Sequence, residues 1–320
     1  MKRYSRLERA YHKCKEFLFG LYWLIVFKRK NSIARKDKVN FSTVDLSRIK
    51  EIEGYFASNN FDNTEIKSVQ NYINEKGITN VFPYDFVYDY YVRCLWKLRY
   101  DRKNLMFYIW HSGKRIYLKQ SKYEDARSYC INLLCEQNKN SPHKYWEGEL
   151  SGSYFFDCGA AEGIFAVENM DNFEHIFLFE ADESWIPALK KTLAPFEDKV
   201  TVIHKFVGNY NSSNNITIDS AIERYNIDIQ KSMFIKMDVE GAEEQVLEGM
   251  QATLKKASDL RLVICTYHKQ DDEYRIKEII DQVGLYKYEM SKGYMILYYD
   301  DLIREPYIRR GVMRVERKER

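Results

Sequence analysis

The stretch Tyr154–Gly163, read as Y-F-F-D-C-G-A-A-E-G, decides the fold of this chain of 320 residues. An apolar run leads into Asp157, Gly159 and Gly163, and a helix-compatible segment, Ile164–Val167, follows. A buried strand, a tight glycine turn and a helix N-terminus in this order are typical of the nucleotide-binding turn of α/β proteins. Glycine lets the backbone approach a ligand closely, because it has no side chain and tolerates unusual backbone angles.

A second apolar run, Phe177–Glu180, ends in an acid that lies 21 positions after Gly159. A carboxylate at this place is suited to accept hydrogen bonds from ribose hydroxyls. Asp157 separates the candidate cofactors, because its negative charge repels a pyrophosphate and suits ammonium and sulfonium groups. The residues therefore predict S-adenosylmethionine and disfavour an NAD-dependent oxidoreductase. Trp185 and Phe206 are candidates to sandwich the adenine, although either also fits an ordinary core.

From Tyr154 onward, strand and helix patterns alternate along the chain. Strands are predicted at 154–157, 176–180, 200–204, 233–238 and 261–266, with a closing hairpin of 286–290 and 294–299. A single helix is predicted over 242–254. Such alternation implies a mostly parallel sheet with helices on both faces. The predicted fold class is α/β, a Rossmann-like seven-stranded sheet with an antiparallel terminal hairpin, preceded by a mixed and mainly helical N-terminal region.

The composition is that of a globular protein, with 45% hydrophobic and 30% charged residues. The six cysteines show no C-x-x-C pair and no zinc spacing, so free thiols in a reducing cytoplasm are expected. No signal peptide and no apolar run long enough to span a bilayer are recognisable. The predicted location is therefore cytoplasmic.

Residues 1–38 form a basic amphipathic arm, with twelve Lys or Arg against three acids and a net charge of +9. Its apolar stretch Phe17–Phe27 suits the surface of an anionic membrane, and it also suits a contact with the protein's own body or with a second copy. Two further parts are predicted. Residues 39–150 form an accessory or substrate-capping region, and residues 151–320 form the cofactor-binding domain with a basic C-terminal tail.

Three side chains are predicted to form the catalytic centre at the carboxyl edge of the sheet. Asp238 and Glu240 flank Val239 at the end of a strand, and strand-end acids at this edge seldom serve packing alone. His268 follows the next strand, and its ordinary pKa near neutrality makes it the natural proton acceptor, unless it is a plain surface histidine. The acids around 238–244 also suit Mg²⁺ or Ca²⁺. No second cluster supports an ion, and no metal is predicted.

The run F-I-K-M-D-V-E-G-A-E-E-Q-V-L-E-G-M at 234–250 resembles the signature of the FkbM-type methyltransferases. The resemblance continues in D-C-G-A-A-E-G (157–163), L-F-E-A-D (178–182), N-I-T-I-D (215–219) and C-T-Y-H-K (265–269), and it spans roughly residues 140–300. It implies the seven-stranded sheet of class I methyltransferases. The residues predicted to bind the cofactor, beside Trp185 and Phe206, are Asp157, Gly159, Ala160, Glu162, Gly163, Glu180, Ala181 and Asp238.

The resemblance further implies O-methylation that depends on S-adenosylmethionine, often of a sugar hydroxyl. The segment Ser141–Tyr145 is similar to members found among bacterial surface-glycan genes. The expected partner is a glycan or small-molecule acceptor and not a nucleic acid, while membrane contact and a homo-oligomer remain open. A non-catalytic adaptor with the same fold is the alternative, although this chain retains the expected cofactor and base residues.

Overall fold

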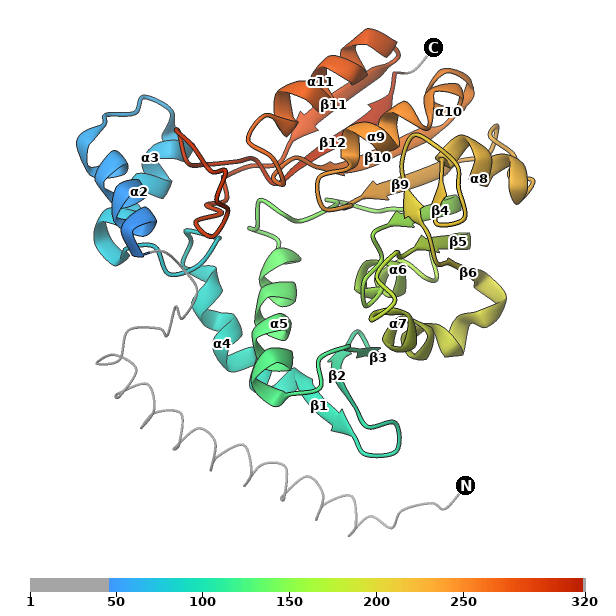
Figure 1. Ribbon diagram of the computed structural model, residues 1–320, viewed down its shortest axis with the longest axis horizontal. Helices are drawn as coiled ribbons and strands as arrows, with labels where there is room; N and C mark the ends of the chain where they lie inside the picture. The colour runs from blue at the N-terminus through green and yellow to red at the C-terminus, as the bar shows by residue number, and fades with distance from the viewer. Residues whose placement is uncertain (1–45, 319–320) are drawn as a thin grey trace. The chain divides into compact units, whose positions relative to one another are not determined.

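The structure, a computed structural model, describes residues 46–318. Its centre is a seven-stranded sheet in the order β11-β12-β10-β9-β4-β5-β6 (Figure 1). The strands are β4 (Gly152–Cys158), β5 (Phe173–Phe179), β6 (Val200–Ile203), β9 (Met233–Met237), β10 (Leu260–Cys265), β11 (Tyr286–Met290) and β12 (Val312–Arg317). Neighbours from β10 to β6 pair in parallel, and β12 is antiparallel to both β10 and β11. The predicted α/β fold class with a mostly parallel seven-stranded sheet is thus confirmed.

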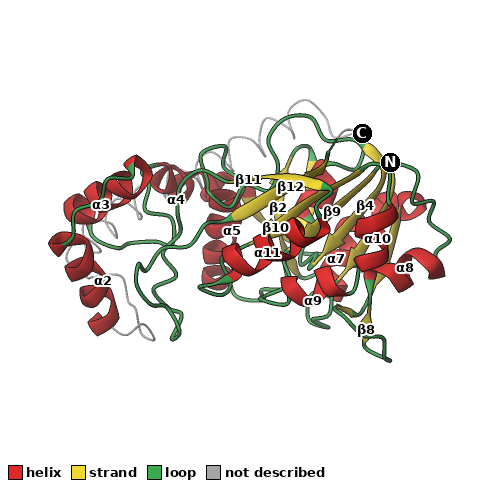
Figure 2. Ribbon diagram, turned by 90° about the horizontal axis from the view of Figure 1, so that it is seen from above, coloured by secondary structure: helices red, strands yellow, loops and turns green. Residues whose placement is uncertain are grey.

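Helices cover both faces of the sheet, because the strands are apolar on both sides. One face packs against α8 (Ile218–Arg224), α9 (Glu243–Glu248), α10 (Gln251–Lys256) and α11 (Asp272–Val283) in a single core cluster. These helices lie together along the strands in Figure 2. The opposite face packs against α6 (Ile164–Glu168), where Phe165 contacts Phe155 and Phe234. The next helix along the chain is α7 (Ile186–Leu193).

The accessory region is mainly helical, as predicted, and contains one further small sheet. Its elements are α2 (Leu46–Ser58), α3 (Thr64–Lys76), α4 (Phe86–Lys97), β1 (Leu98–Asp101), β2 (Met106–His111), β3 (Lys114–Tyr117) and α5 (Tyr123–Glu136). The short elements η1 (Ala194–Lys199), β7 (Phe206–Val207) and β8 (Asn215–Ile216) follow later in the chain. A compact unit begins at Ile52 and holds every element from α3 onward. The predicted boundary at residue 150 falls inside this unit. The division into a substrate-capping region and a cofactor-binding domain stays a prediction.

The predicted second strand of the terminal hairpin, 294–299, is wrong. Residues 312–317 pair with β11 instead, and Met295 makes only an isolated bridge with Arg309. The apolar side chains of Met295, Ile296 and Leu297 are buried without a strand ladder, and the Ile296 N–H donates to the carbonyl of Val81. The accessory region therefore supplies one of the backbone hydrogen bonds that a strand partner would have given.

The predicted helix 242–254 is broken at Gly249 and Met250 into α9 and α10. Gly249 lies so close to the loop before α8 that an added Cβ would meet the carbonyl oxygen of Gly208 at 2.0 Å. The carboxylate of Asp219 accepts hydrogen bonds from the N–H groups of Ala252 and Thr253, each at 2.9 Å. This carboxylate satisfies the free N–H groups of a new helix start, which stabilises the break.

Two sequence expectations concern parts of the chain that the structure covers incompletely. The basic arm, residues 1–38, lies outside the described residues. Within residues 46–318, no helix combines the length and the apolar character that crossing a bilayer requires. The five described cysteines are free and buried, as expected, and Cys14 lies outside the described residues.

Candidate functional site

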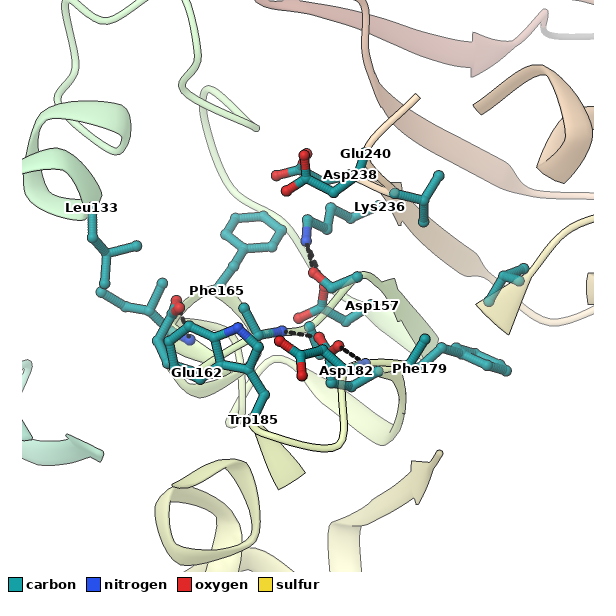
Figure 3. Close-up of a pocket in the computed structure, with 18 of the residues that line it drawn as sticks. Leu133, Asp157, Glu162, Phe165, Phe179, Asp182, Trp185, Lys236, Asp238 and Glu240 are labelled. Atoms are coloured by element: carbon teal, nitrogen blue, oxygen red, sulfur yellow. Dashed lines mark hydrogen bonds and ion pairs between the residues drawn. The ribbon is translucent and has the colours of Figure 1, made fainter. Parts of the chain in front are cut away.

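A cavity of about 460 Å³ opens at the carboxyl ends of β4, β5 and β9 (Figure 3). Its size lies within the range of small-molecule sites. Most of the predicted site residues line it: Asp157, Gly159, Ala160, Glu162, Glu180, Ala181, Trp185, Phe206, Asp238 and Glu240. Gly163 and His268 are not among the lining residues. The structure therefore brings the strand-end residues to one place, as the parallel sheet requires.

The glycine turn after β4 allows two close approaches of the backbone. Gly159 has a φ of +79°, and a Cβ there would lie 1.8 Å from the carbonyl oxygen of Asp238. Gly163 has a φ of +80° and precedes α6, where a Cβ would lie 2.8 Å from Leu189. Gly159 thus brings the loops after β4 and β9 together, whereas Gly163 permits packing of α6 on α7.

Glu180 joins the loops that follow β4 and β5 at one end of the cavity. One carboxylate oxygen accepts a hydrogen bond from the Ala161 N–H, and the other accepts one from the Asp182 N–H, each at 2.7 Å. Each oxygen has a further lone pair, so ribose hydroxyls remain acceptable donors. The side chain therefore holds the site's shape in addition to its predicted binding role.

Trp185 and Phe206, the two candidates for contact with adenine, differ in burial. Trp185 is buried against Tyr129, with the Lys119 ammonium 4.6 Å from its ring centroid. Phe206 is 59% exposed and borders the same cavity. Both rings line the cavity, and their contact with adenine stays a prediction.

A buried ion pair lies at the centre of the site. Asp157 and Lys236 are opposite each other in the β4–β9 pairing, and their charged atoms are 3.0 Å apart. Burial raises the pKa of Asp157, and the charge on Lys236 opposes that rise. Burial alone would lower the pKa of Lys236, but Asp157 and Asp238 hold it well above its usual range. Lys236 therefore stays charged and balances Asp157 from within the protein.

Asp238 accepts hydrogen bonds from two tyrosines, Tyr145 at 2.5 Å and Tyr267 at 3.2 Å. The ring of His143 lies 3.1 Å from the Tyr267 hydroxyl. Burial alone would raise the pKa of Asp238, but the charges of Lys236 and His268 hold it well below its usual range. Asp238 is therefore a fixed negative charge at the wall of the cavity.

His268 meets three carboxylates, which the sequence did not predict in full. Its Nε2 atom lies 3.4 Å from Asp238 and 3.6 Å from Glu240, and its Nδ1 atom lies 2.9 Å from Glu243. Burial alone would lower the pKa of His268, but Glu243, Asp238 and Glu240 raise it to about 9. The expectation of a pKa near neutrality is thus wrong for this arrangement, because three acids stabilise the imidazolium.

Sequence reasoning missed several lining residues: Tyr129, Glu136, Tyr145, Lys236 and Tyr267. Burial raises the pKa of Glu136 to about 8, and the nearby charges of Asp238 and Glu162 act in the same direction. A lysine inside an apolar strand was a usable signal for Lys236, because a buried charge needs a partner. The tyrosines carried no comparable signal in a chain with 26 of them.

Comparison with solved structures finds several methyltransferases at low identity. Methyltransferase FkbM from Methylobacillus flagellatus KT is 18% identical with a TM-score of 0.39, over 79% of this chain and 59% of that chain. This chain thus spans less than two thirds of that protein's length. Precorrin-6y C5,15-methyltransferase from Geobacter metallireducens GS-15 is 14% identical with a TM-score of 0.36, over 54% of this chain and 83% of that chain.

A Streptococcus mutans protein in complex with SAH is 12% identical with a TM-score of 0.36, over 52% of this chain and 90% of that chain. Among curated proteins, none matches this chain significantly. The family model described as Methyltransferase FkbM domain matches residues 122–290, which is more than half of the chain. The chain therefore belongs to the FkbM methyltransferase family.

Proposed function

We propose that this protein transfers a methyl group from S-adenosylmethionine to a hydroxyl oxygen, and that the acceptor is a sugar of a bacterial surface glycan or its precursor. Membership of the FkbM methyltransferase family supports the reaction class. The sugar acceptor rests on the sequence resemblance around Ser141–Tyr145.

The charge of the cavity is the observation that carries the choice of cofactor. Seven acids border it (Glu136, Asp157, Glu162, Glu180, Asp182, Asp238 and Glu240), against three lysines (Lys119, Lys205 and Lys236). This excess of acids favours a ligand with ammonium and sulfonium groups and opposes a dinucleotide pyrophosphate. The cofactor end is the turn after β4 together with Glu180, where a nucleoside is expected to lie.

Methyl transfer needs the acceptor oxygen, the methyl carbon and the sulfur in line, so positioning supplies much of the catalysis. As the new carbon–oxygen bond forms, the methyl–sulfur bond breaks, and the acceptor oxygen passes its proton to Glu240, a carboxylate that borders the cavity and whose pKa is raised by burial. Asp238 and Glu240 border the cavity directly, and His268 contacts both of them. We assign the acceptor hydroxyl to this end of the cavity, beside these three side chains.

Calorimetry with S-adenosylmethionine and with NAD tests the cofactor. We expect S-adenosylmethionine to bind and NAD not to bind. Glu180→Ala should weaken binding by about 1–3 kcal/mol, because hydrogen bonds to a carboxylate are lost. Glu183→Ala is the matched control, since Glu183 is exposed and does not border the cavity. Equal affinity in the two variants would remove Glu180 from the binding site, and tight NAD binding would overturn the proposal.

A transfer assay tests the acceptor. Radiolabelled methyl donor is incubated with sugar nucleotides and with glycan fragments, and labelled products are counted. We expect label on a sugar that carries a free hydroxyl. If the cofactor binds and no sugar in a broad panel is methylated, the sugar assignment fails while the cofactor assignment stands.

A further inference from the structure

The loop between β9 and α9 holds Glu240 in a strained backbone conformation. Glu240 has a φ of +53°, in the left-handed region that a residue with a side chain rarely adopts. Gly241 follows with a φ of +92°, which glycine adopts without strain. A strained residue persists only where its surroundings impose the conformation, and such residues gather at functional sites. A glutamate at this position therefore needs an explanation other than folding.

Contacts on both sides of Glu240 impose this conformation. The Oε1 atom of Glu243 accepts hydrogen bonds from the N–H groups of Val239 and Gly241, at 3.0 and 3.4 Å. The Lys269 ammonium donates to the carbonyl of Gly241. The backbone is thus fixed before and after Glu240, at a point where its side chain borders the cavity.

His268 lies between Glu243 and Glu240 and pairs with both. Its Nδ1 atom is 2.9 Å from Oε1 of Glu243, and its Nε2 atom is 3.6 Å from Oε2 of Glu240 and 3.4 Å from Oδ1 of Asp238. Both ring nitrogens of an imidazolium carry a proton, so one ring serves carboxylates on its two opposite edges. The Arg309 guanidinium donates to the carbonyl of His268 at 2.9 Å, which fixes the backbone of this residue as well.

We propose that His268 is a positioning residue, whose imidazolium is held by Glu243 and keeps the Glu240 carboxylate ionised and in place at the acceptor end. The reaction that Glu240 serves is that of the proposed function, on which this inference rests. Glu240 takes the proton of the acceptor hydroxyl as the oxygen bonds to the methyl carbon and the methyl–sulfur electron pair stays on sulfur. The side chain of Glu240 also reaches solvent, so the proton passes on to water. His268 keeps both of its ring protons throughout.

The charges around the two side chains fit this division of roles. Burial alone would lower the pKa of His268, but its three carboxylate neighbours raise it to about 9. Burial, Asp238 and Glu243 raise the pKa of Glu240, and the charge of His268 opposes that rise. Lys236 pairs with Asp157, so among residues 46–318 the cation within ion-pair distance of Glu240 is His268. The other titratable groups that face this pair are His143, Asp272, Glu136, Lys236 and Tyr299.

Nuclear magnetic resonance of the full chain with isotope-labelled histidine rings tests the charge of His268 without any acceptor. We expect its ring to titrate with a midpoint near 9. His268→Gln identifies the signal among the six histidines. Glu243→Gln, which keeps an acceptor oxygen for the loop, should lower the midpoint by about 1 to 3 pH units, because a paired carboxylate is lost. Thermal unfolding checks that each variant folds.

Glu244→Gln is the matched control, because Glu244 neighbours Glu243 on α9 but lies beside Arg275 and not beside His268. It should leave the midpoint of His268 unchanged. A midpoint near the ordinary value of about 6.5 in the wild type would overturn the proposal. So would a midpoint that Glu243→Gln leaves in place.

The dependence of the methylation rate on pH, measured with the sugar that the transfer assay labels, tests the role of the pair. The wild-type rate should fall in acid as Glu240 takes up a proton. In His268→Gln this fall should move to higher pH, because the positive charge that opposes protonation of Glu240 is gone. Loss of the fall in that variant would make His268 the proton acceptor and overturn the proposal.

Glu240→Gly separates function from folding at the strained position. Glycine adopts a positive φ at no steric cost, so this variant should unfold at about the same temperature as the wild type or higher. Its rate should nevertheless fall by about 10²- to 10⁴-fold, as should that of Glu240→Gln, because the proton acceptor is lost. A wild-type rate in either variant would contradict the role of Glu240. If no sugar is labelled, the proposed function fails, while the titration of His268 still decides the charge of its ring.

Discussion

The two ends of the cavity are built from the chain in different ways. The cofactor end comes from two short segments, residues 157–162 and 180–185, which follow neighbouring strands. Backbone groups hold it together: the N–H groups of Gly159 and Ala160 both donate to the carbonyl of Phe179 at 3.0 Å. The acceptor end combines residues from α5, from the segment before β4 and from the loops after β9 and β10.

The two ends are therefore held in shape by different interactions. Close backbone approach fixes the cofactor end, so added volume should damage it most. Paired charges and hydroxyl groups fix the acceptor end, so a change of charge should damage it most. Lys236 belongs to both ends. It pairs with Asp157 on one side, and on the other its charge lowers the pKa of Asp238 and so favours the ionised carboxylate.

Gly159→Ala is expected to have the largest effect. A Cβ there would lie 1.8 Å from the carbonyl oxygen of Asp238, at a backbone φ of +79° that disfavours alanine. Strain and overpacking together should lower the free energy of unfolding by about 3–6 kcal/mol. Urea unfolding measures the loss. Gly208→Ala is the control, since a Cβ there meets nothing closer than 4.0 Å. Equal stability of the two variants would contradict the role of close approach.

Lys236→Met should cause the second-largest loss of stability, because it leaves Asp157 buried without its partner. Removing one member of a buried ion pair typically lowers the free energy of unfolding by about 3–5 kcal/mol. The double variant with Asp157→Asn removes both charges and should recover most of that loss. Thermal unfolding of the three variants measures the coupling. If the double variant is as unstable as the sum of the singles, the pair does not interact as the structure indicates.

Glu65→Gln, at a distance from the cavity, should cause the smallest loss of stability. Glu65 on α3 accepts from the Gly293 N–H and pairs with Arg310, each at 2.8 Å. The neighbouring Arg309 donates to the carbonyls of Tyr267 and His268, so this segment supports the acceptor end. The pair is partly exposed, and we expect a loss of at most about 1 kcal/mol at neutral pH.

The pH dependence of that loss identifies its origin. Burial raises the pKa of Glu65, but the Gly293 N–H and the Arg310 guanidinium lower it by more, so the net pKa is below the usual value. Its stabilisation is therefore present above the ordinary carboxyl pKa and disappears as the pH falls through the lowered value. The difference from the wild type should shrink in acid. Glu75→Gln, an exposed acid on the same helix, should show no such difference.

The sheet and most of the cofactor end could be predicted from the sequence. Each strand there is an apolar run, and the residues after consecutive parallel strands necessarily meet at one edge. Asp157, Gly159 and Glu180 were found by position alone for that reason. Strand β12, which lies between β10 and β11, was missed, because 294–299 is as apolar as a strand but forms only an isolated bridge with Arg309 and a hydrogen bond to Val81.

The acceptor end was only partly predictable. Asp238, Glu240 and His268 were found as strand-end residues, but their charge states depend on partners that strand order brings together. Glu243 begins α9, where acids are common, so nothing in the sequence indicates that its side chain is buried against His268. Tyr145 and Tyr267 are separated by 122 positions and meet only at Asp238. No local pattern specifies such a meeting.

The position of β12 has a consequence for synthesis of the chain. Of the strands in the described residues it is the last to be made, yet it lies between β10 and β11. Until residues 312–317 leave the ribosome, the edge of β10 is unpaired and β11 has no neighbour. At about 5–20 residues per second, the 27 residues from Met290 to Arg317 take about 1–5 s to add. During that interval the nascent protein presents an open, apolar strand edge, which is the kind of surface that chaperones shield.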